Sequence, residues 1–173
     1  MKTKFPKKKY KNLNTFVHDY QDLLFKTLSK VHLKKLDKAV NLIEKKIKSN
    51  SQIFVCGNGG SAAISNHYIA DYLKSLRTKT KLKPKFISLA SNLELITAIS
   101  NDMDYSKVFS YQLESLANSG DIVIIISSSG NSKNIINLIK YAKKKKIKII
   151  GFTGFDGGYV SKKSDISIHV DIK

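Results

Sequence analysis

The 173-residue sequence has one cysteine, two prolines, no tryptophan and 13 acidic residues against 31 basic ones. The single cysteine, Cys56, cannot form an internal disulfide, which excludes a disulfide-stapled scaffold and favours a reducing compartment such as the cytoplasm. No apolar run approaches the roughly 18 residues that span a bilayer, and residues 1–11 lack the apolar core of a signal peptide. The length and the 42% hydrophobic content predict one folded domain with a buried core.

The formal charge of +18 raises the possibility of a nucleic-acid binder. Thirty of the basic residues are lysine, and Arg77 is the only arginine. Specific recognition of phosphates and bases favours the planar, bidentate guanidinium group of arginine. The composition therefore favours a solvated basic surface that attracts anions, and a charge-driven nucleic-acid binder stays as an alternative.

The chain divides into a basic arm and one domain. The N-terminal arm (residues 1–11) carries six lysines and no acid, and it is predicted to be mobile. Residues 12–173 form the domain, in which 12–50 contain two amphipathic helices and 51–173 an α/β core. The first helix is expected to have Asn14 or Thr15 as its N-cap, and the second to end near residues 49–50.

Five short apolar runs alternate with helical segments after residue 51. The runs are residues 52–56, 85–89, 121–126, 148–152 and 165–170. Unbroken β-branched runs that alternate with helices indicate a parallel sheet with helices on both faces. The fold class is therefore a three-layer, doubly wound α/β domain with a five-stranded parallel sheet and two N-terminal helices.

Three polar turns follow the first, third and fourth of these runs. They are residues 57–61 (GNGGS, the glycine loop), 127–132 (SSSGNS, the serine loop) and 153–158 (TGFDGG, the second glycine turn). Ligands of parallel sheets bind beyond the carboxyl ends of the strands, and hydroxyls with free N–H groups at a helix start suit a phosphate. Neither a Walker lysine pattern nor a G-x-G-x-x-G fingerprint is present, so a phosphorylated sugar is favoured and no nucleotide cofactor is expected.

His67 and Asp71 lie four residues apart on the helix that leaves the glycine loop. This spacing places both side chains on one face and suits two metal ligands, an acid/base pair or a simple surface interaction. Tyr68 and Tyr72 on the same helix are expected in the core or at an interface. Cys56 ends a buried strand and is expected to pack as a small apolar residue.

The segments FVCGNGGSAAISNHYIADYL, ISSSGNS and TGFDGG resemble the sugar isomerase (SIS) domain, and within it the phosphoheptose isomerases. The resemblance runs from about Asn14 to the end of the chain and implies a homo-oligomer, a tetramer or dimer, with the N-terminal helices at its interfaces. It implies substrate-binding and phosphate-holding roles for Asn58, Gly59, Gly60, Ser61, Asn101, Asp102, Ser127, Ser128, Ser129 and Ser132.

The same resemblance implies that His67 is a zinc ligand and that Asp71 is both a zinc ligand and the proton-transfer base. The family carries Glu where this chain has Asp71, so the carboxylate here is one methylene shorter. A family helix after the fifth strand supplies a Gln and a His that complete the zinc site. The sequence ends at Lys173 before such a helix, so we expect an incomplete zinc site and an uncovered sheet face.

The sequence therefore predicts a phosphosugar ketose–aldose isomerase that resembles sedoheptulose 7-phosphate isomerase and supplies heptose for surface polysaccharide. Aldose–ketose isomerisation moves a proton between neighbouring carbons, and a carboxylate such as Asp71 is a natural base for it. The alternative is a SIS module that binds a phosphosugar or a protein without catalysis.

Overall fold

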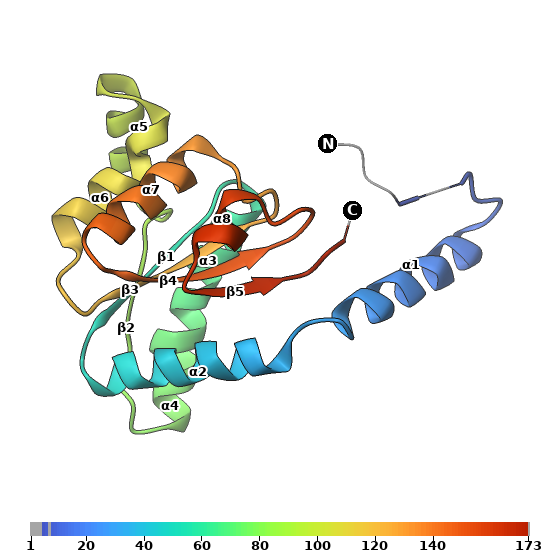
Figure 1. Ribbon diagram of the computed structural model, residues 1–173, viewed down its shortest axis with the longest axis horizontal. Helices are drawn as coiled ribbons and strands as arrows, with labels where there is room; N and C mark the ends of the chain where they lie inside the picture. Colours follow the sequence, from blue (N-terminus) through green and yellow to red (C-terminus); the bar gives the residue numbers. More distant parts are fainter. Residues whose placement is uncertain (1–4, 7, 173) are drawn as a thin grey trace.

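The computed structural model describes residues 5, 6 and 8–172. Its centre is one sheet of five parallel strands in the order β2-β1-β3-β4-β5 (Figure 1). The strands are β1 Gln52–Cys56, β2 Lys85–Ser88, β3 Ile122–Ser127, β4 Lys148–Thr153 and β5 Ile166–His169. All five apolar runs therefore form strands close to their predicted positions, and the parallel sheet is confirmed.

Helices connect the strands and precede the first one. They are α1 Leu13–Leu28, α2 Leu33–Lys48, α3 Gly60–Ala70, η1 Asp71–Leu76, α4 Arg77–Lys79, α5 Leu93–Asp102, η2 Tyr105–Lys107, α6 Val108–Leu116, α7 Lys133–Lys144 and α8 Gly158–Lys163. The N-cap of α1 is Asn12, whose Oδ1 accepts from the Thr15 N–H, so the predicted cap at Asn14 or Thr15 is wrong by two or three residues.

Helices cover both faces of the sheet, as the predicted three-layer fold requires. Alternate residues of β3 point to opposite faces, so Val123 and Ile125 enter one core while Ile122 and Ile124 enter the other. The first core includes side chains of α5, α6, α7 and α8, and the second those of α2, α3 and η1. On the second face, Ile126, Phe152 and Ile166 are partly buried and pack against the core. The sheet face that we expected to be uncovered is therefore partly exposed at these residues and not bare.

Two helical details differ from the predictions. The helix after the glycine loop continues as a six-residue π-helix, η1, beginning at Asp71. A short helix, α8, follows the second glycine turn, where no helix was expected. Both deviations are local. A π-helix such as η1 is a short change of hydrogen bonding within a helix, which the apolar pattern does not reveal. Helix α8 has six residues, too few to show a clear helical period of apolar side chains.

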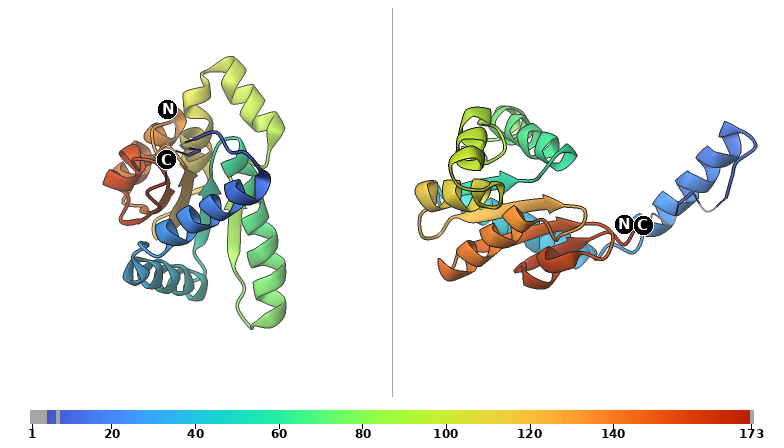
Figure 2. Two further views of the ribbon diagram at one scale, coloured as in Figure 1. Left: turned by 90° about the vertical axis from the view of Figure 1, so that its right-hand side faces the viewer. Right: turned by 90° about the horizontal axis from the view of Figure 1, so that it is seen from above.

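Helix α1 extends away from the sheet, as the views in Figure 2 show. The described residues of the N-terminal arm lie against it: the Phe5 ring is 5.4 Å from that of Phe16 and 5.8 Å from that of Tyr20. Lys8 Nζ is 2.9 Å from Asp19 Oδ2, to which the Tyr10 hydroxyl also donates. No helix in the described part of the chain is long and apolar enough to cross a membrane.

Candidate functional site

The three polar turns lie at one edge of the sheet. Because β1, β3 and β4 are parallel neighbours, the glycine loop, the serine loop and the second glycine turn all leave the carboxyl ends of adjacent strands (Figure 1). The structure thus brings together the segments that the sequence predicted to bind a phosphorylated ligand.

The glycine loop combines one tightly packed glycine with two open ones. A Cβ at Gly57 would lie 2.5 Å from the Ser61 Cβ, so only glycine fits there. Gly59 has a φ of 54° and precedes the first residue of α3, Gly60. A Cβ at either of these two would meet no described atom within 4 Å, which leaves the backbone open to a ligand at the start of α3.

Asn58 joins the glycine loop to the first turn of α7, which directly follows the serine loop. Its Nδ2 donates to Asn134 Oδ1 over 3.0 Å, and Asn134 Nδ2 donates back to Asn58 Oδ1 over 2.8 Å. The Tyr105 hydroxyl also donates to Asn58 Oδ1, over 2.9 Å. Asn134, in the first turn of α7, is buried. These bonds hold Asn58 in one orientation from two sides.

Sequence reasoning missed Asn134 and Tyr105. Asn134 comes two residues after the serine loop, where an amide in the first turn of a helix near a phosphate motif was a usable signal. Tyr105 comes three residues after Asp102, and its contact with Asn58 spans 47 positions. No local pattern predicts a contact of that separation.

The serine loop is partly closed by its own hydrogen bonds. Ser127 is buried and its Oγ accepts from the Gly130 N–H over 3.2 Å, while Ser129 Oγ accepts from the Asn131 N–H over 3.4 Å. Ser128 is exposed, and Ser132 is the N-cap of α7 without a side-chain capping bond. The Ser128 and Ser132 hydroxyls are therefore the ones best placed to bind an added phosphate.

The second glycine turn packs backbone to backbone against the serine loop. A Cβ at Gly130 would overlap Gly157 O, and one at Gly158 would overlap Ser129 O. The Tyr159 N–H donates to Asn131 Oδ1 over 2.9 Å, and the Gly154 N–H donates to Ser128 O over 3.0 Å. The turn therefore supports the serine loop through contacts that only glycine permits.

His67 and Asp71 contact each other but stay exposed. His67 Nε2 lies 3.5 Å from Asp71 Oδ1, and the two side chains keep 74% and 55% of their accessible surface. The predicted pairing across one helical turn is confirmed. The structure gives neither side chain a hydrogen bond to the glycine or serine loops in the part of the chain that it describes.

Asn101 and Asp102 end α5 as exposed residues. Asn101 Nδ2 donates to Asp102 Oδ1 over 2.9 Å, so the two side chains form one polar unit. Among the described residues neither side chain has a hydrogen bond to the glycine loop; the contact with Asn58 is made by Tyr105, three residues further on.

The two tyrosines beside Asp71 are half-buried. Burial raises the pKa of the Tyr68 phenol, and the charge of Asp71 raises it further. Burial also raises the pKa of Tyr72, to which Tyr68 and then Asp71 contribute. Tyr72 stacks on Phe86 with ring centroids 3.9 Å apart, which confirms its predicted core position. Both phenols stay neutral hydrogen-bond donors at pH 7 next to a cavity of about 480 Å³.

The residues present do not fit a complete zinc site within one chain. His67 and Asp71 offer two donors, whereas a catalytic zinc takes three protein ligands. Among residues 5, 6 and 8–172, no group of three His, Cys, Asp or Glu side chains could hold a metal ion. Cys56 is no substitute, because complete burial raises the pKa of its thiol and keeps it protonated.

A strand order of β2-β1-β3-β4-β5, with Gly- and Ser-rich loops at the carboxyl edge, defines a doubly wound α/β domain whose ligand-binding edge suits an anion. Residues 15–154 match the model of the SIS domain family. The chain is 38% identical to a phosphoheptose isomerase of Aliarcobacter butzleri over 135 residues, which cover 78% of this chain and 71% of that protein. This chain belongs to the SIS domain family and, within it, to the phosphoheptose isomerases.

Solved structures show the same likeness. A phosphoheptose isomerase from Neisseria gonorrhoeae superposes with a TM-score of 0.78 at 28% identity, covering 93% of this chain and 87% of that one. A phosphoheptose isomerase from Francisella tularensis superposes with a TM-score of 0.80 at 26% identity, covering 92% and 83% of the two chains. The predicted SIS-type fold is confirmed.

Proposed function

We propose that this protein is a phosphosugar ketose–aldose isomerase that converts sedoheptulose 7-phosphate into the corresponding aldose. The observation that carries the proposal is the pre-built serine loop, held by the second glycine turn and joined through Asn134 to Asn58. Such a loop fixes one phosphate and leaves the rest of the sugar to extend from it. The family's shared activity supports the same conclusion.

In the proposed reaction a carboxylate moves one proton between two carbons. Asp71 removes the proton from C1 of the ketose, which gives an enediol, and the proton is returned to C2 while a hydroxyl proton passes from O1 to O2. His67, 3.5 Å from Asp71, orients the carboxylate. Asn58, Asn101 and Asp102 would bind the sugar hydroxyls.

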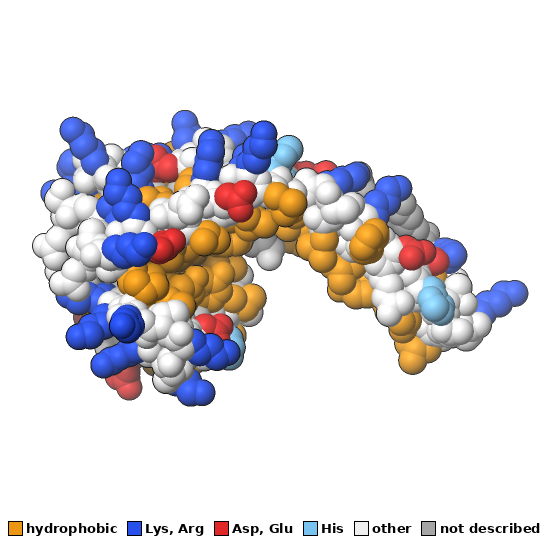
Figure 3. Space-filling model, turned by 90° about the horizontal axis from the view of Figure 1, so that it is seen from below, with side chains coloured by type: hydrophobic (Ala, Val, Ile, Leu, Met, Phe, Trp, Pro, Cys, Tyr) orange, Lys and Arg blue, Asp and Glu red, His pale blue; other side chains and the backbone are white. Residues whose placement is uncertain are grey.

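We propose that a homo-oligomer, a tetramer or dimer, completes the site. Five large apolar side chains of α1 are exposed: Leu13, Val17, Tyr20, Phe25 and Leu28. Figure 3 shows hydrophobic side chains along the inner side of the projection that contains α1, and in the hollow between this projection and the rest of the domain. A second copy packed against α1 would remove these apolar side chains from water, which supports it as their cover.

The position of the base supports the same assembly. The side chains of His67 and Asp71 keep 74% and 55% of their accessible surface. A second copy packed on this face could therefore supply groups that the exposed His67–Asp71 pair lacks. We also propose a cytoplasmic location, which suits the free thiol of Cys56.

The direct test is turnover of sedoheptulose 7-phosphate by the purified chain, with and without added zinc. Aldose formation is followed by NMR, and Asp71→Ala is compared with Asp37→Ala, which removes an exposed carboxylate from α2. We expect turnover in the wild type and Asp37→Ala and its loss in Asp71→Ala. Sugar phosphate binding without turnover in the wild type would instead support a non-catalytic module.

A further inference from the structure

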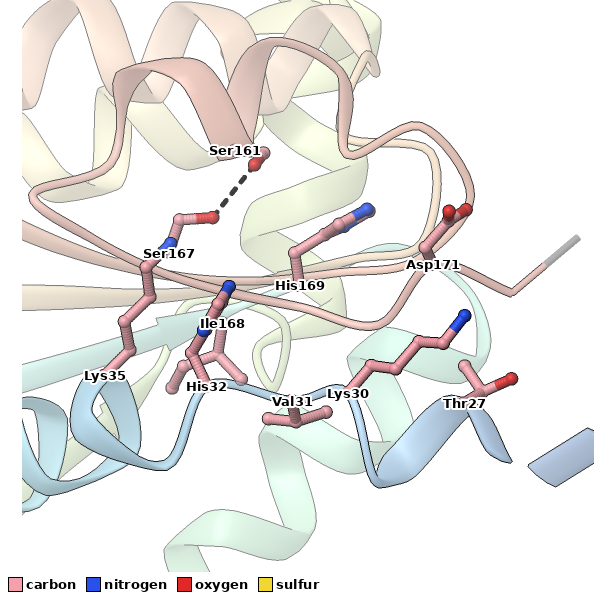
Figure 4. Close-up of a pocket in the computed structure, with 10 residues that line it drawn as sticks. All are labelled: Thr27, Lys30, Val31, His32, Lys35, Ser161, Ser167, Ile168, His169 and Asp171. Atoms are coloured by element: carbon pink, nitrogen blue, oxygen red, sulfur yellow. Dashed lines mark hydrogen bonds between the residues drawn. The ribbon is translucent and has the colours of Figure 1, made fainter. Parts of the chain in front are cut away.

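A second polar cavity lies where the segment joining α1 to α2 meets β5, behind the second glycine turn, whose Gly157 packs against Ser161 and whose Thr153 contacts His169. It has a volume of about 240 Å³. Figure 4 shows side chains reaching into it from both walls, the helical segment on one side and α8 with β5 on the other. Its chemistry comes from donors on these two walls: Lys30, His32, Lys35, Ser161, Ser167 and His169.

The cavity has an excess of positive charge. Lys30 and Lys35 form no ion pair within 4.0 Å with any described residue, although they line the same small space. One carboxylate, that of Asp171, also lines the cavity. Two lysines against one aspartate leave a net positive charge, and a partly enclosed space strengthens its attraction for an anion relative to open water.

The opposite wall offers hydrogen-bond groups in a fixed arrangement. The Ser161 and Ser167 hydroxyls lie 3.0 Å apart, so one of their two protons is free for a ligand. His169 Nδ1 shares a 2.9 Å hydrogen bond with Thr153 Oγ1. This bond holds the ring and leaves Nε2 available to the cavity. The start of α2 adds backbone N–H groups that no side chain caps.

We propose that this cavity is a second anion site, separate from the serine loop, that takes a phosphate group. Lys30 and Lys35 would supply the charge and Ser161, Ser167 and His169 the hydrogen bonds. A bound phosphate would bridge the α1–α2 segment to β5. Since α1 carries the exposed apolar side chains, the anion would hold that helix in one direction relative to the sheet. The proposal does not depend on catalysis.

The four histidines make the test selective. Only His32 and His169 line the cavity, whereas His18 is on α1 and His67 is on α3. The full chain is titrated with inorganic phosphate at constant pH, and the four imidazoles are followed by NMR. Their signals are assigned with His32→Gln and His169→Gln. A parallel titration with sodium chloride matches the ionic strength, and another uses sedoheptulose 7-phosphate.

We expect saturable shifts of the His32 and His169 signals with phosphate but not with chloride. The double variant Lys30→Gln/Lys35→Gln should weaken this binding roughly tenfold or more, because it removes two charged donors. Lys34→Gln/Lys38→Gln makes the same charge change on α2 outside the cavity and should leave it unaltered. A His32 response to the sugar phosphate alone that is lost in Lys30→Gln/Lys35→Gln would identify the source of the phosphate group and support the site. A sugar phosphate response of His169 alone that survives in that variant would come from the neighbouring serine loop and would overturn the proposal.

Two other results would also overturn the proposal. One is the absence of a saturable response of His32 and His169 to either phosphate compound. The other is an equal loss of response in both double variants, since a general charge effect would then explain it. Circular dichroism of each variant checks that the fold is retained before the titrations are compared.

Discussion

The serine loop and the His67–Asp71 pair are held in opposite ways. Hydrogen bonds and glycine contacts from the neighbouring turn fix the serine loop before any ligand arrives. The His67–Asp71 pair lies on an exposed helix face, and the close polar contact between the two side chains is not backed by a hydrogen bond from either loop among the described residues. The comparison indicates that one chain pre-organises the serine loop by itself, whereas it leaves the side chains of His67 and Asp71 exposed. The proposed function therefore needs substrate or a second copy to order that pair.

The largest expected effect concerns the exposed pair. Asp71→Asn keeps the shape of the side chain and removes the base, so kcat should fall by about 10²- to 10⁴-fold. The free energy of unfolding should stay within about 0.5 kcal/mol of the wild-type value, because the side chain is exposed. Steady-state kinetics measure the fall in kcat, and urea denaturation of the same preparation measures the free energy of unfolding. A large loss of stability would contradict the comparison.

The next effect concerns the fixed loop. Gly130→Ala adds a Cβ that overlaps Gly157 O at a φ of 66°, and it should lower the free energy of unfolding by about 2–4 kcal/mol. Gly120→Ala is the control, because its φ is also positive but its Cβ would reach only Ser51 Oγ, at 4.0 Å. Equal losses in the two variants would show that backbone strain, and not the packed turn, holds the serine loop.

A smaller effect is expected where the two loops join. Asn134→Ala removes the buried amide that exchanges two hydrogen bonds with Asn58, which should cost about 1–3 kcal/mol. It should also raise the KM for the sugar phosphate, since Asn58 loses its orientation. Asn41→Ala on the exposed side of α2 is the matched control for urea melts and kinetics. An unchanged KM would remove Asn58 from the proposed substrate contacts.

The smallest effect lies at acid pH, far from the site. Burial raises the pKa of Asp165. Hydrogen bonds from Lys148, the Ile149 N–H and Lys143 together lower that pKa by more than burial raises it, so the net shift is downward. A lowered pKa stabilises the fold above the ordinary Asp value of about 3.9, and this stability is lost as the pH falls through the folded value. Asp165→Asn should therefore flatten the loss of stability below about pH 4 in urea melts.

Much of the fold followed from local patterns. The β-branched runs predicted all five strands, and their order in the chain predicted a parallel sheet with its polar turns at one edge. The spacing of His67 and Asp71 predicted their contact, because four residues make about one helical turn. The cap of α1, the short helix α8 and the π-helix at Asp71 were missed, since each depends on one or two residues.

The sequence by itself determined the five strands and the residue types of the glycine and serine loops, because hydrophobic period and glycine content act over a few neighbours. Only the tertiary structure decided that Tyr105 and Asn134 meet at Asn58, that the second glycine turn supports the serine loop, and that Lys30 and Lys35 share a cavity with His169. These contacts join residues dozens of positions apart, and their geometry arises when the sheet and its helices pack.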